Sequence, residues 1–391
     1  MRYFSFAFFF FFLLYFNVTA QDIGYTTFGK GVRIMASDSS FSLKFSARFQ
    51  TRYVGAVNLE DNSYQDRILI RRWRLKFDGF AVDPRLVYKL ELGFSNRDTG
   101  GGDIIQTNNT SRVILDAVLK WNFYKNWTVW FGQTKLPGNR ERVISSQKLQ
   151  FVDRSLANTL TLDRDIGVQL RHHHTLGKVV VREIGSISMG EGRDITVDNA
   201  GGYDYTARLE ILPFGTFISK GDYFSADLKR EPSPKLAIGL TYDYNDDASK
   251  SRGQLGSFLS EARDLLSIHA DAIFKYKGVS SLVEYTHREV VTRGPVISTD
   301  TLGNVTEAFL TGNGFQISGG YLLKSNYEFA LRWHGFLPEE EIQRNDIYSY
   351  AFGLSKYIRD HNLKVQSDFT YSQIENTDDA FVIRFQVELS F

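Results

Sequence analysis

Apolar and polar residues alternate along many segments of this chain. In residues 41–53, one set of alternate positions is mostly apolar or aromatic, and the other is polar or basic. Only a β-strand places alternate side chains on opposite faces, whereas a helix would scatter the charges around its axis. The same period recurs near residues 86–95, 113–121, 205–212, 236–244, 268–277 and 381–391. The pattern therefore predicts an all-β protein.

Strand length and the spacing of the connections favour a transmembrane barrel over a soluble sandwich. The alternating segments run for about ten residues, which suits a tilted strand that crosses a bilayer. Aromatic residues gather at strand ends, and long connections alternate with short ones. The long connections are predicted at 54–65, 97–111, 136–161, 190–203, 246–266, 292–313, 338–346 and 374–378. The short ones are predicted at 79–85, 122–126, 173–178, 213–234, 278, 324–325 and 359–360.

This spacing predicts an antiparallel transmembrane β-barrel of sixteen strands. If the N-terminus lies in the periplasm, the long connections are extracellular loops and the short ones are periplasmic turns. Residues 222–231 could form a further strand, but that strand would break the even count. A long periplasmic connection at 213–234 is the preferred interpretation.

The N-terminus resembles a cleaved export signal. Arg2 precedes an apolar run at residues 4–16, and Val18 and Ala20 occupy the small-residue positions of a cleavage site. Residues 1–20 are therefore predicted to be a signal peptide, cleaved after Ala20, of a protein bound for the outer membrane of a Gram-negative bacterium. Residues 21–391 are predicted to form one barrel domain, with a periplasmic N-terminal segment at 21–40. A C-terminal strand is predicted at 379–391, and its terminal Phe391 resembles an outer-membrane assembly signal.

Composition excludes several classes of function. The mean hydropathy is −0.26, and no second long apolar run follows the signal, so a helical membrane protein is disfavoured. A net charge of +1 argues against nucleic acid as a partner. No cofactor and no metal site are expected. The run His172–His174 resembles a metal-binding tract, but alternate side chains at a strand end diverge, so a solvated turn is favoured.

Six segments carry a resemblance to a known family, the phosphate-selective porins O and P. These segments are residues 28–34, 71–79, 83–93, 131–142, 151–158 and 205–215, and the likeness covers most of residues 28–391. The resemblance implies a sixteen-stranded, usually trimeric porin. A homotrimer in outer-membrane lipid, passing small anionic solutes, is therefore the expectation.

Basic residues on the inward face of the first two strands are candidates for an anion-binding wall. With Trp73, Leu75 and Phe77 facing lipid, the inward set is Lys44, Arg48, Arg52, Arg72, Arg74 and Lys76. Stacked side by side, these six cations would form a basic ladder for phosphate or carboxylate groups. Arg71 breaks the alternation and is expected to point outward near the extracellular rim. The alternative is a lumen wall that is merely polar.

The third long connection, residues 136–161, is the candidate constriction loop. By the resemblance, and by its apolar residues Leu136, Val143, Leu149 and Phe151, it is expected to fold into the barrel. Its charged residues are Arg140, Glu141, Arg142, Lys148, Asp153 and Arg154. The alternative is a surface loop whose charges are solvated. Acidic candidates in the lumen are Glu91, Asp116, Glu210 and Asp271.

The sequence therefore predicts a porin that passes small anionic or polar solutes by diffusion, with phosphate or polyphosphate as candidates. No covalent step is needed, and an enzyme is not expected. Two other classes stay open, which are a hydrolase embedded in the barrel and a surface adhesin or structural barrel without conductance. An active importer is disfavoured, because residues 21–40 are too few for a plug domain. The solute and the resting state of the pore are not predicted.

Overall fold

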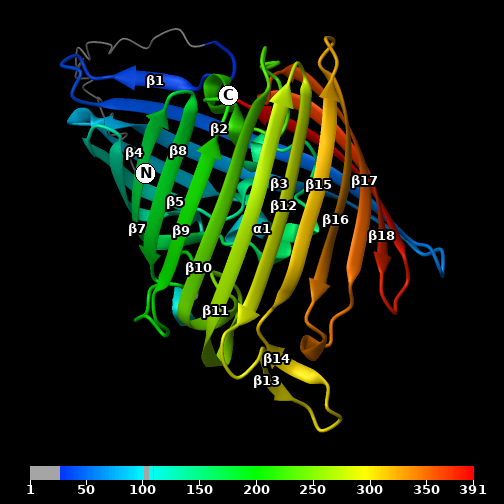
Figure 1. Ribbon diagram of the computed structural model, residues 1–391. Helices are drawn as coiled ribbons and strands as arrows, with labels where there is room; N and C mark the ends of the chain where they lie inside the picture. Colours follow the sequence, from blue (N-terminus) through cyan, green and yellow to red (C-terminus); the bar gives the residue numbers. More distant parts are fainter. Residues whose placement is uncertain (1–26, 101–104, 109) are drawn as a thin grey trace, which may run out of the picture.

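Sixteen antiparallel strands close into a barrel (Figure 1). The computed structural model describes residues 27–100, 105–108 and 110–391, so the predicted signal peptide and its cleavage site lie outside the described residues. The predicted fold class and strand count are confirmed. The barrel strands are β2 (Ser42–Asn58), β3 (Tyr64–Ala81), β4 (Asp83–Gly93), β5 (Ile114–Tyr124), β6 (Trp127–Lys135), β7 (Arg164–Leu176), β8 (Val179–Ser188), β9 (Asp204–Leu212), β10 (Lys235–Arg252), β11 (Leu255–Tyr276), β12 (Val279–Val290), β15 (Gly312–Leu322), β16 (Tyr327–Pro338), β17 (Ile347–Arg359), β18 (Leu363–Ile374) and β19 (Ala380–Ser390).

Three further strands and several short helices lie outside the barrel wall. Strand β1 (Val32–Met35) pairs with β2, and β13 (Val296–Thr299) pairs with β14 (Val305–Ala308). The helices of the described residues are α1 (Asn96–Thr99), α2 (Arg140–Val143), η1 (Ile105–Thr107), η2 (Ser146–Lys148), η3 (Leu156–Leu160), η4 (Ile218–Tyr223) and η5 (Glu340–Ile342). None of these helices has the length and apolar character to cross a membrane.

The strands carry their polar face inward and their apolar face outward. In β9, Asp204, Thr206 and Arg208 are buried inside, whereas Tyr205 and Leu209 are exposed on the outer wall. This inverts the pattern of a soluble protein, because the solvent of the outer face is lipid. The barrel closes where β19 pairs with β2, and the backbones of Phe391 and Ala47 exchange two hydrogen bonds of 3.0 Å.

The two ends of the barrel differ. The turn end, at the top of Figure 1, carries the short β3–β4, β5–β6 and β7–β8 connections and the C-terminal residue. The loop end, at the bottom, carries the longer β4–β5, β6–β7, β8–β9 and β12–β15 connections. Long and short connections alternate broadly as predicted.

Some predicted loops are wrong, because the strands extend beyond the apolar belt. Residues 246–266 were expected to form a loop, but most of them continue β10 and β11 as a paired hairpin that turns at Gly253. Backbone pairing persists where both faces of a hairpin meet water, and there the side chains need not alternate. The first loop, expected at 54–65, likewise shrinks to residues 59–63.

The 213–234 connection at the turn end contains no strand, so residues 222–231 are part of a long connection, as preferred. It contains η4 and turns into the barrel, where Asp222 and Asp227 are buried. Phe217 packs with Leu212 and with wall residues of β8, β10, β11 and β12. Lys275 of β11 donates hydrogen bonds of 2.8 and 2.7 Å to the carbonyls of Gly221 and Ala226. This connection therefore covers the inner wall of β8–β12 near the turn end.

Candidate functional site

A cavity of about 1210 Å³ lies inside the barrel along the inner face of β3–β8. Its opposite side is formed by the third loop (residues 136–163, between β6 and β7) and by the 213–234 connection. Its lining includes Asn126 in the β5–β6 turn and both Arg97 and Arg112 in the β4–β5 loop. Residues from both ends of the barrel therefore line one continuous space.

The third loop packs flat against the far wall through apolar contacts. Phe151 packs against Ala330 of β16 and Ala351 of β17. The wall also leaves room for the backbone, because a Cβ atom on Gly314 would lie 2.9 Å from the Cα atom of Ala157. Small wall residues thus let the loop fill one half of the lumen and leave the other half as the cavity.

Charged groups hold the start of the third loop at the same wall. The Arg140 guanidinium is fully buried, with its Nε atom 2.7 Å from Asp271 and an Nη atom 3.2 Å from Glu210. The backbone N–H of Glu141 donates a 2.6 Å hydrogen bond to Glu284 of β12. These contacts fix the first two residues of α2 at the far wall.

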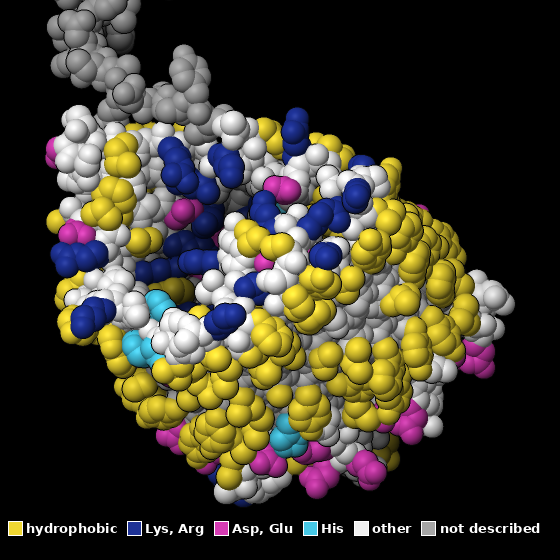
Figure 2. Space-filling view, turned by 45° about the horizontal axis from the view of Figure 1, so that its top comes forward, with side chains coloured by type: hydrophobic (Ala, Val, Ile, Leu, Met, Phe, Trp, Pro, Cys, Tyr) yellow, Lys and Arg dark blue, Asp and Glu magenta, His cyan; other side chains and the backbone are white. Residues whose placement is uncertain are grey.

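Basic side chains dominate the cavity lining. Figure 2, which looks toward the turn end, shows Lys and Arg side chains around and within a hollow, and apolar side chains over the outer wall. Eighteen Lys and Arg residues line the cavity against five Asp and Glu residues. The basic residues are Arg71, Arg72, Arg74, Lys89, Arg97, Arg112, Lys120, Lys135, Arg142, Lys148, Arg154, Arg164, Arg171, Arg182, Arg193, Lys220, Arg252 and Arg384. The acidic ones are Glu91, Asp98, Asp116, Asp153 and Asp163.

The acidic residues of the lining are already paired. Arg74 lies 2.9 Å from Asp98 and 3.2 Å from Glu91, and Lys89 lies 2.8 Å from Asp116. The remaining two, Asp153 and Asp163, pair with Arg52 and Arg142 at 2.6 Å. Opposite charges at these distances cancel most of each other's field, so the unpaired cations set the potential of the cavity.

Several cations of the lining have only neutral partners. Among the described residues, no carboxylate lies within 4.0 Å of Arg72, Lys120, Lys135, Arg154 or Arg171. Arg72 donates to the amide oxygen of Gln50 at 2.8 Å, and Lys135 and Arg154 donate to backbone carbonyls of the third loop. Lys120 and Arg171 lie 3.8 and 3.9 Å from the ring centroid of one inward-facing tryptophan, Trp130. Such partners orient the cations without neutralising them.

Burial changes the proton affinity of the loop cations. It lowers the pKa of Lys148 to about 8, and neighbouring Lys76 and Arg48 lower it further in the same direction. Burial, followed by repulsion from Arg142, lowers the pKa of Arg154 to about 9. Both groups are therefore still mostly protonated at neutral pH. Burial alone would raise the pKa of Asp153, but the nearby arginines hold it well below its usual range.

The six cations predicted on the first two strands do not form one exposed ladder. Only Arg72 and Arg74 line the cavity. The third loop covers Arg48 and Arg52, which donate hydrogen bonds to Ser146 and to the carbonyl of Val152. The remaining two cations, Lys76 and Lys44, lie near the turn end. Lys76 pairs with Asp78 at 2.8 Å, and Lys44 is partly buried on β2.

Arg71 does not point outward as predicted. A β-bulge shifts the register of β2 and β3, so that Gln50 pairs with Arg72 whereas Thr51 pairs with Ile70. The extra residue in β3 reverses the alternation, so both Arg71 and Arg72 are buried inside. Arg71 lies 3.5 Å from Asp153 and lines the cavity.

The predicted loop residues divide between the two sides of the third loop. Arg142, Lys148 and Arg154 line the cavity. Arg140 and Glu141 face the far wall instead, where Glu141 lies 3.5 Å from Arg332. Of the acidic candidates, Glu91 and Asp116 line the cavity, and Glu210 and Asp271 bind Arg140.

Sequence reasoning missed most of the basic residues on β5–β8. Lys120, Arg171 and Arg182 line the cavity from these strands. The signal was present in β7, where Gln169 and Arg171 alternate with outward apolar positions such as Leu170. Assigning every second residue of each predicted strand to the lumen would have identified these basic residues.

Comparison with known proteins agrees with the barrel. Residues 43–388 match the sequence profile of a family described as phosphate-selective porin O and P. A protein of Aquifex aeolicus described as uncharacterized is 23% identical over 384 residues, which cover 89% of this chain and 87% of that protein.

Three solved structures are similar in fold. An anion-selective porin from Comamonas acidovorans has a TM-score of 0.56 at 9% identity and covers 90% of this chain and 100% of its own. The outer membrane channel DcaP of Acinetobacter baumannii has a TM-score of 0.56 at 11% identity, and the match covers 92% of this chain and 99% of that structure's chain. The trimer form of OmpT from Vibrio cholerae has a TM-score of 0.53 at 13% identity, and the match covers 89% of this chain and 99% of that structure's chain. At these identities the likeness concerns the fold.

Proposed function

The chain belongs to the phosphate-selective porin O and P family and is an outer-membrane channel, and we propose that its basic cavity makes this channel selective for small anions. The observation that carries the proposal is the excess of eighteen Lys and Arg over five Asp and Glu in the lining. Lumen charges of one sign attract counter-ions and repel ions of their own sign. The transport needs no covalent step.

The cations form a path between the two ends of the barrel. At the loop end an anion meets Arg97 and Arg112, and near mid-height it meets Arg72 and Arg154. Toward the turn end, Arg171 continues the path beside Trp130. Sites of similar charge in sequence favour conduction, because an ion that leaves one cation reaches the next without a deep trap.

Phosphate and polyphosphate are the proposed solutes, with small carboxylates as competitors. Guanidinium groups present planar pairs of N–H donors that match phosphate and carboxylate oxygens. The proposed constriction is the third loop, which places Arg142, Lys148 and Arg154 opposite the β3–β8 wall. Because the Arg154 guanidinium is held by two loop carbonyls at 2.8 and 3.0 Å, its position is fixed while its charge stays available.

Export and assembly complete the proposal. We propose that residues 1–20 are removed after Ala20 in a Gram-negative cell, and that residues 21–40, including β1, face the periplasm at the turn end. A homotrimer is proposed because a similar barrel, OmpT of Vibrio cholerae, is described in a trimer form. Unheated gel electrophoresis and native mass spectrometry of the refolded protein would measure the oligomeric state.

Ion selectivity of the refolded protein tests the proposal. In a planar bilayer under a KCl gradient, the reversal potential should show preference for chloride, and phosphate should block the chloride current. Arg72→Gln and Arg171→Gln should lower this preference without unfolding the barrel, because neither leaves a carboxylate unpaired. At about 5 Å from an ion in water, one charge contributes about 0.8 kcal/mol, so each variant should lower chloride occupancy about fourfold.

The matched control is Lys324→Gln, which removes one positive charge from an exposed position in the β15–β16 turn. Its chloride preference should equal that of the unchanged protein. Cation preference, or equal permeability to both ions, would contradict the anion proposal. A correctly folded barrel without conductance would instead favour a structural role.

A further inference from the structure

Two histidines and a glutamate converge on the outer face of the barrel near the turn end. His172 and His174 lie on β7, and Glu183 lies directly opposite His172 on β8. On these strands, Val168 and Leu170 of β7 and Ile187 of β8 are exposed on the outer wall. His172, His174 and Glu183 occupy the same alternate positions of their strands and therefore face the same way. The three side chains are therefore directed toward the outer wall, although His172 also borders the cavity.

The earlier expectation that the histidine side chains diverge holds for only one of the three. His173 points to the inner face, while the rings of His172 and His174 stack on the outer face with their centroids 5.6 Å apart. Both His172 and His173 border the cavity. The predicted turn at 173–178 is also shorter than expected, because β7 continues to Leu176. Strand alternation thus brings the first and third histidines together rather than apart.

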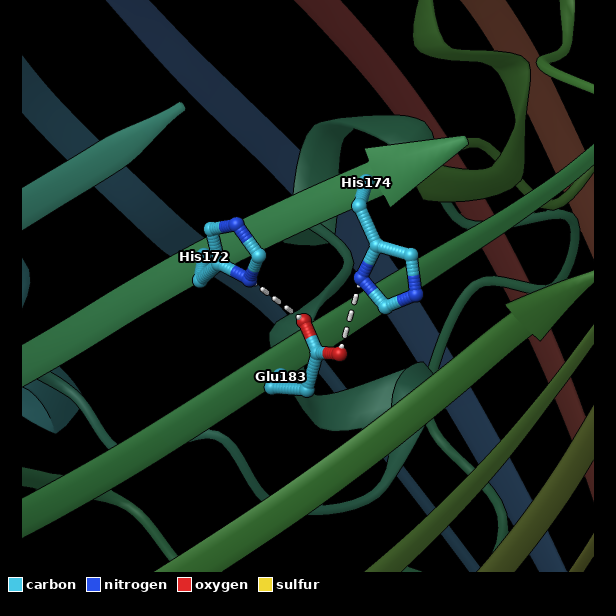
Figure 3. A group of neighbouring side chains, drawn as sticks. All are labelled: His172, His174 and Glu183. Atoms are coloured by element: carbon cyan, nitrogen blue, oxygen red, sulfur yellow. Dashed lines mark hydrogen bonds and ion pairs between the residues drawn. The ribbon is translucent and has the colours of Figure 1, made fainter. Parts of the chain in front are cut away.

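Figure 3 shows both imidazole rings turned toward one carboxylate. The Nδ1 atoms of His172 and His174 lie 3.1 and 3.0 Å from the two oxygens of Glu183. All the ligand atoms of the group lie within 4.8 Å of one another. Zinc ligands at about 2.0–2.1 Å in a tetrahedron are about 3.3 Å apart, so small side-chain movements would place one ion among the three.

We propose that His172, His174 and Glu183 bind a divalent transition-metal ion, with Zn²⁺ as the expected occupant. Two imidazole nitrogens and one carboxylate oxygen suit borderline cations such as Zn²⁺, whereas Mg²⁺ and Ca²⁺ prefer oxygen ligands alone. The side chains are 23%, 37% and 42% exposed, so water can complete the coordination. This site goes beyond the proposed channel function and does not depend on it.

The position of the site explains how an ion could reach it. His174 is two residues from the end of β7, and the β7–β8 turn consists of Gly177 and Lys178. At about 3.3 Å per residue, the group lies within about 17 Å of the turn, at the edge of the apolar belt. Trp127 stacks on His172 at 4.2 Å, as expected of an aromatic residue in the interfacial girdle.

A bound ion would link two neighbouring strands beside the mouth of the barrel. Because the ion binds only when β7 and β8 are paired, it should raise the temperature at which the folded barrel is lost. The ligands lie on the outer wall, so the ion selectivity of the channel should not change.

Calorimetric titration of the refolded, tag-free protein with Zn²⁺ tests the site. One Zn²⁺ should bind per protomer, and Mg²⁺ should not. Even an outer-shell partner of a metal ligand is worth about 10–100-fold in affinity, so His172→Ala and Glu183→Ala should each weaken binding by at least about tenfold. His174→Ala supplies the same test if one of these variants fails to fold.

His173→Ala is the matched control, because it removes a histidine of the same run from the opposite face. It should bind Zn²⁺ as the unchanged protein does. Cu²⁺ provides a second readout, since an ion bound at His172 should quench Trp127, and the quenching should be lost in Trp127→Phe. The proposal is overturned if no stoichiometric Zn²⁺ binds, if His172→Ala has no effect, or if His173→Ala weakens binding equally.

Discussion

The buried ion cluster around Arg140 offers the sharpest test of how the third loop is held. Three arginines and three carboxylates form six ion pairs there, with no excess of either sign. The members are Arg140, Arg182, Arg208, Glu210, Asp222 and Asp271. Only Arg140 comes from the third loop, so it is the ionic tether between this loop and the cluster.

Arg140→Met removes the tether and keeps a long unbranched side chain. Asp271 and Glu210 each lose one cationic partner while they remain almost fully buried, at 4% and 1% exposure. Breaking a buried pair by removing one partner costs about 3–5 kcal/mol, because the other charge stays buried. We expect the free energy of unfolding to fall by about 3 kcal/mol, near the lower limit, because Arg208 still contacts both carboxylates.

Urea unfolding of the barrel in lipid vesicles, followed by tryptophan fluorescence, measures this loss. Single-channel recordings of the same variant should show larger current fluctuations, because the loop is less firmly held beside the cavity. Arg293→Met is the control, since it breaks an exposed pair with Glu261 and should have a much smaller effect.

A second substitution shows whether Arg140→Met lowers stability through charge imbalance in the cluster or through lost packing. Arg140→Met combined with Asp271→Asn restores equal numbers of positive and negative groups in the cluster. Contacting residues couple by about 0.5–3 kcal/mol, so the double variant should be more stable than Arg140→Met alone. If the double variant is less stable, or if Arg140→Met costs below about 1 kcal/mol, the cluster does not hold the loop as argued.

Other parts of the lumen give three further predictions. Because the pKa of Lys148 is lowered to about 8, raising the pH from about 7 to about 9 should remove most of its positive charge and reduce chloride preference, and Lys148→Arg should make this pH step smaller, leaving the part that comes from Arg154. Gly314→Leu should push the third loop into the cavity, lowering single-channel conductance and costing about 1–3 kcal/mol, whereas Gly185→Ala, whose Cβ would meet nothing within 4 Å, should be neutral. Phe151→Ala should cost about 3–5 kcal/mol in urea unfolding, because the ring is buried against the wall, and a loss under about 1 kcal/mol would contradict this packing.

The barrel itself was predictable because its signal is local. Alternation in β9 assigns every residue to lipid or lumen without knowledge of its neighbours, and the even count of such segments implies closure. Arg142 and Lys148 were identified for a related reason, since both lie in a long connection between recognisable strands. Where a strand can be recognised from its own alternation of apolar and polar residues, its inward-facing residues can be identified from the sequence alone.

The errors arise where a position depends on a second segment. Arg71 turns inward because a bulge forms against β2, and the register of a pair is not visible in one strand. Arg48 and Arg52 are inward as expected, but the third loop covers them, and its path depends on small residues of distant strands such as Gly314. Inward direction alone therefore does not show which cations meet the solute.

The net charge of the chain conceals the property on which the proposed function depends. Among the residues that the structure describes, 18 Lys and Arg but only five Asp and Glu line the cavity. Since the full sequence has 46 Lys and Arg and 45 Asp and Glu, the residues outside this lining include twelve more acidic than basic ones. The fold separates the charges by pairing carboxylates with the loop on one wall, as at Arg140, and by giving cations on the other wall neutral partners, as at Arg72. A nearly neutral chain can thus enclose a strongly positive path. Neutralising Arg72 should therefore alter selectivity far more than neutralising Lys324 outside the cavity, although both change the total charge equally.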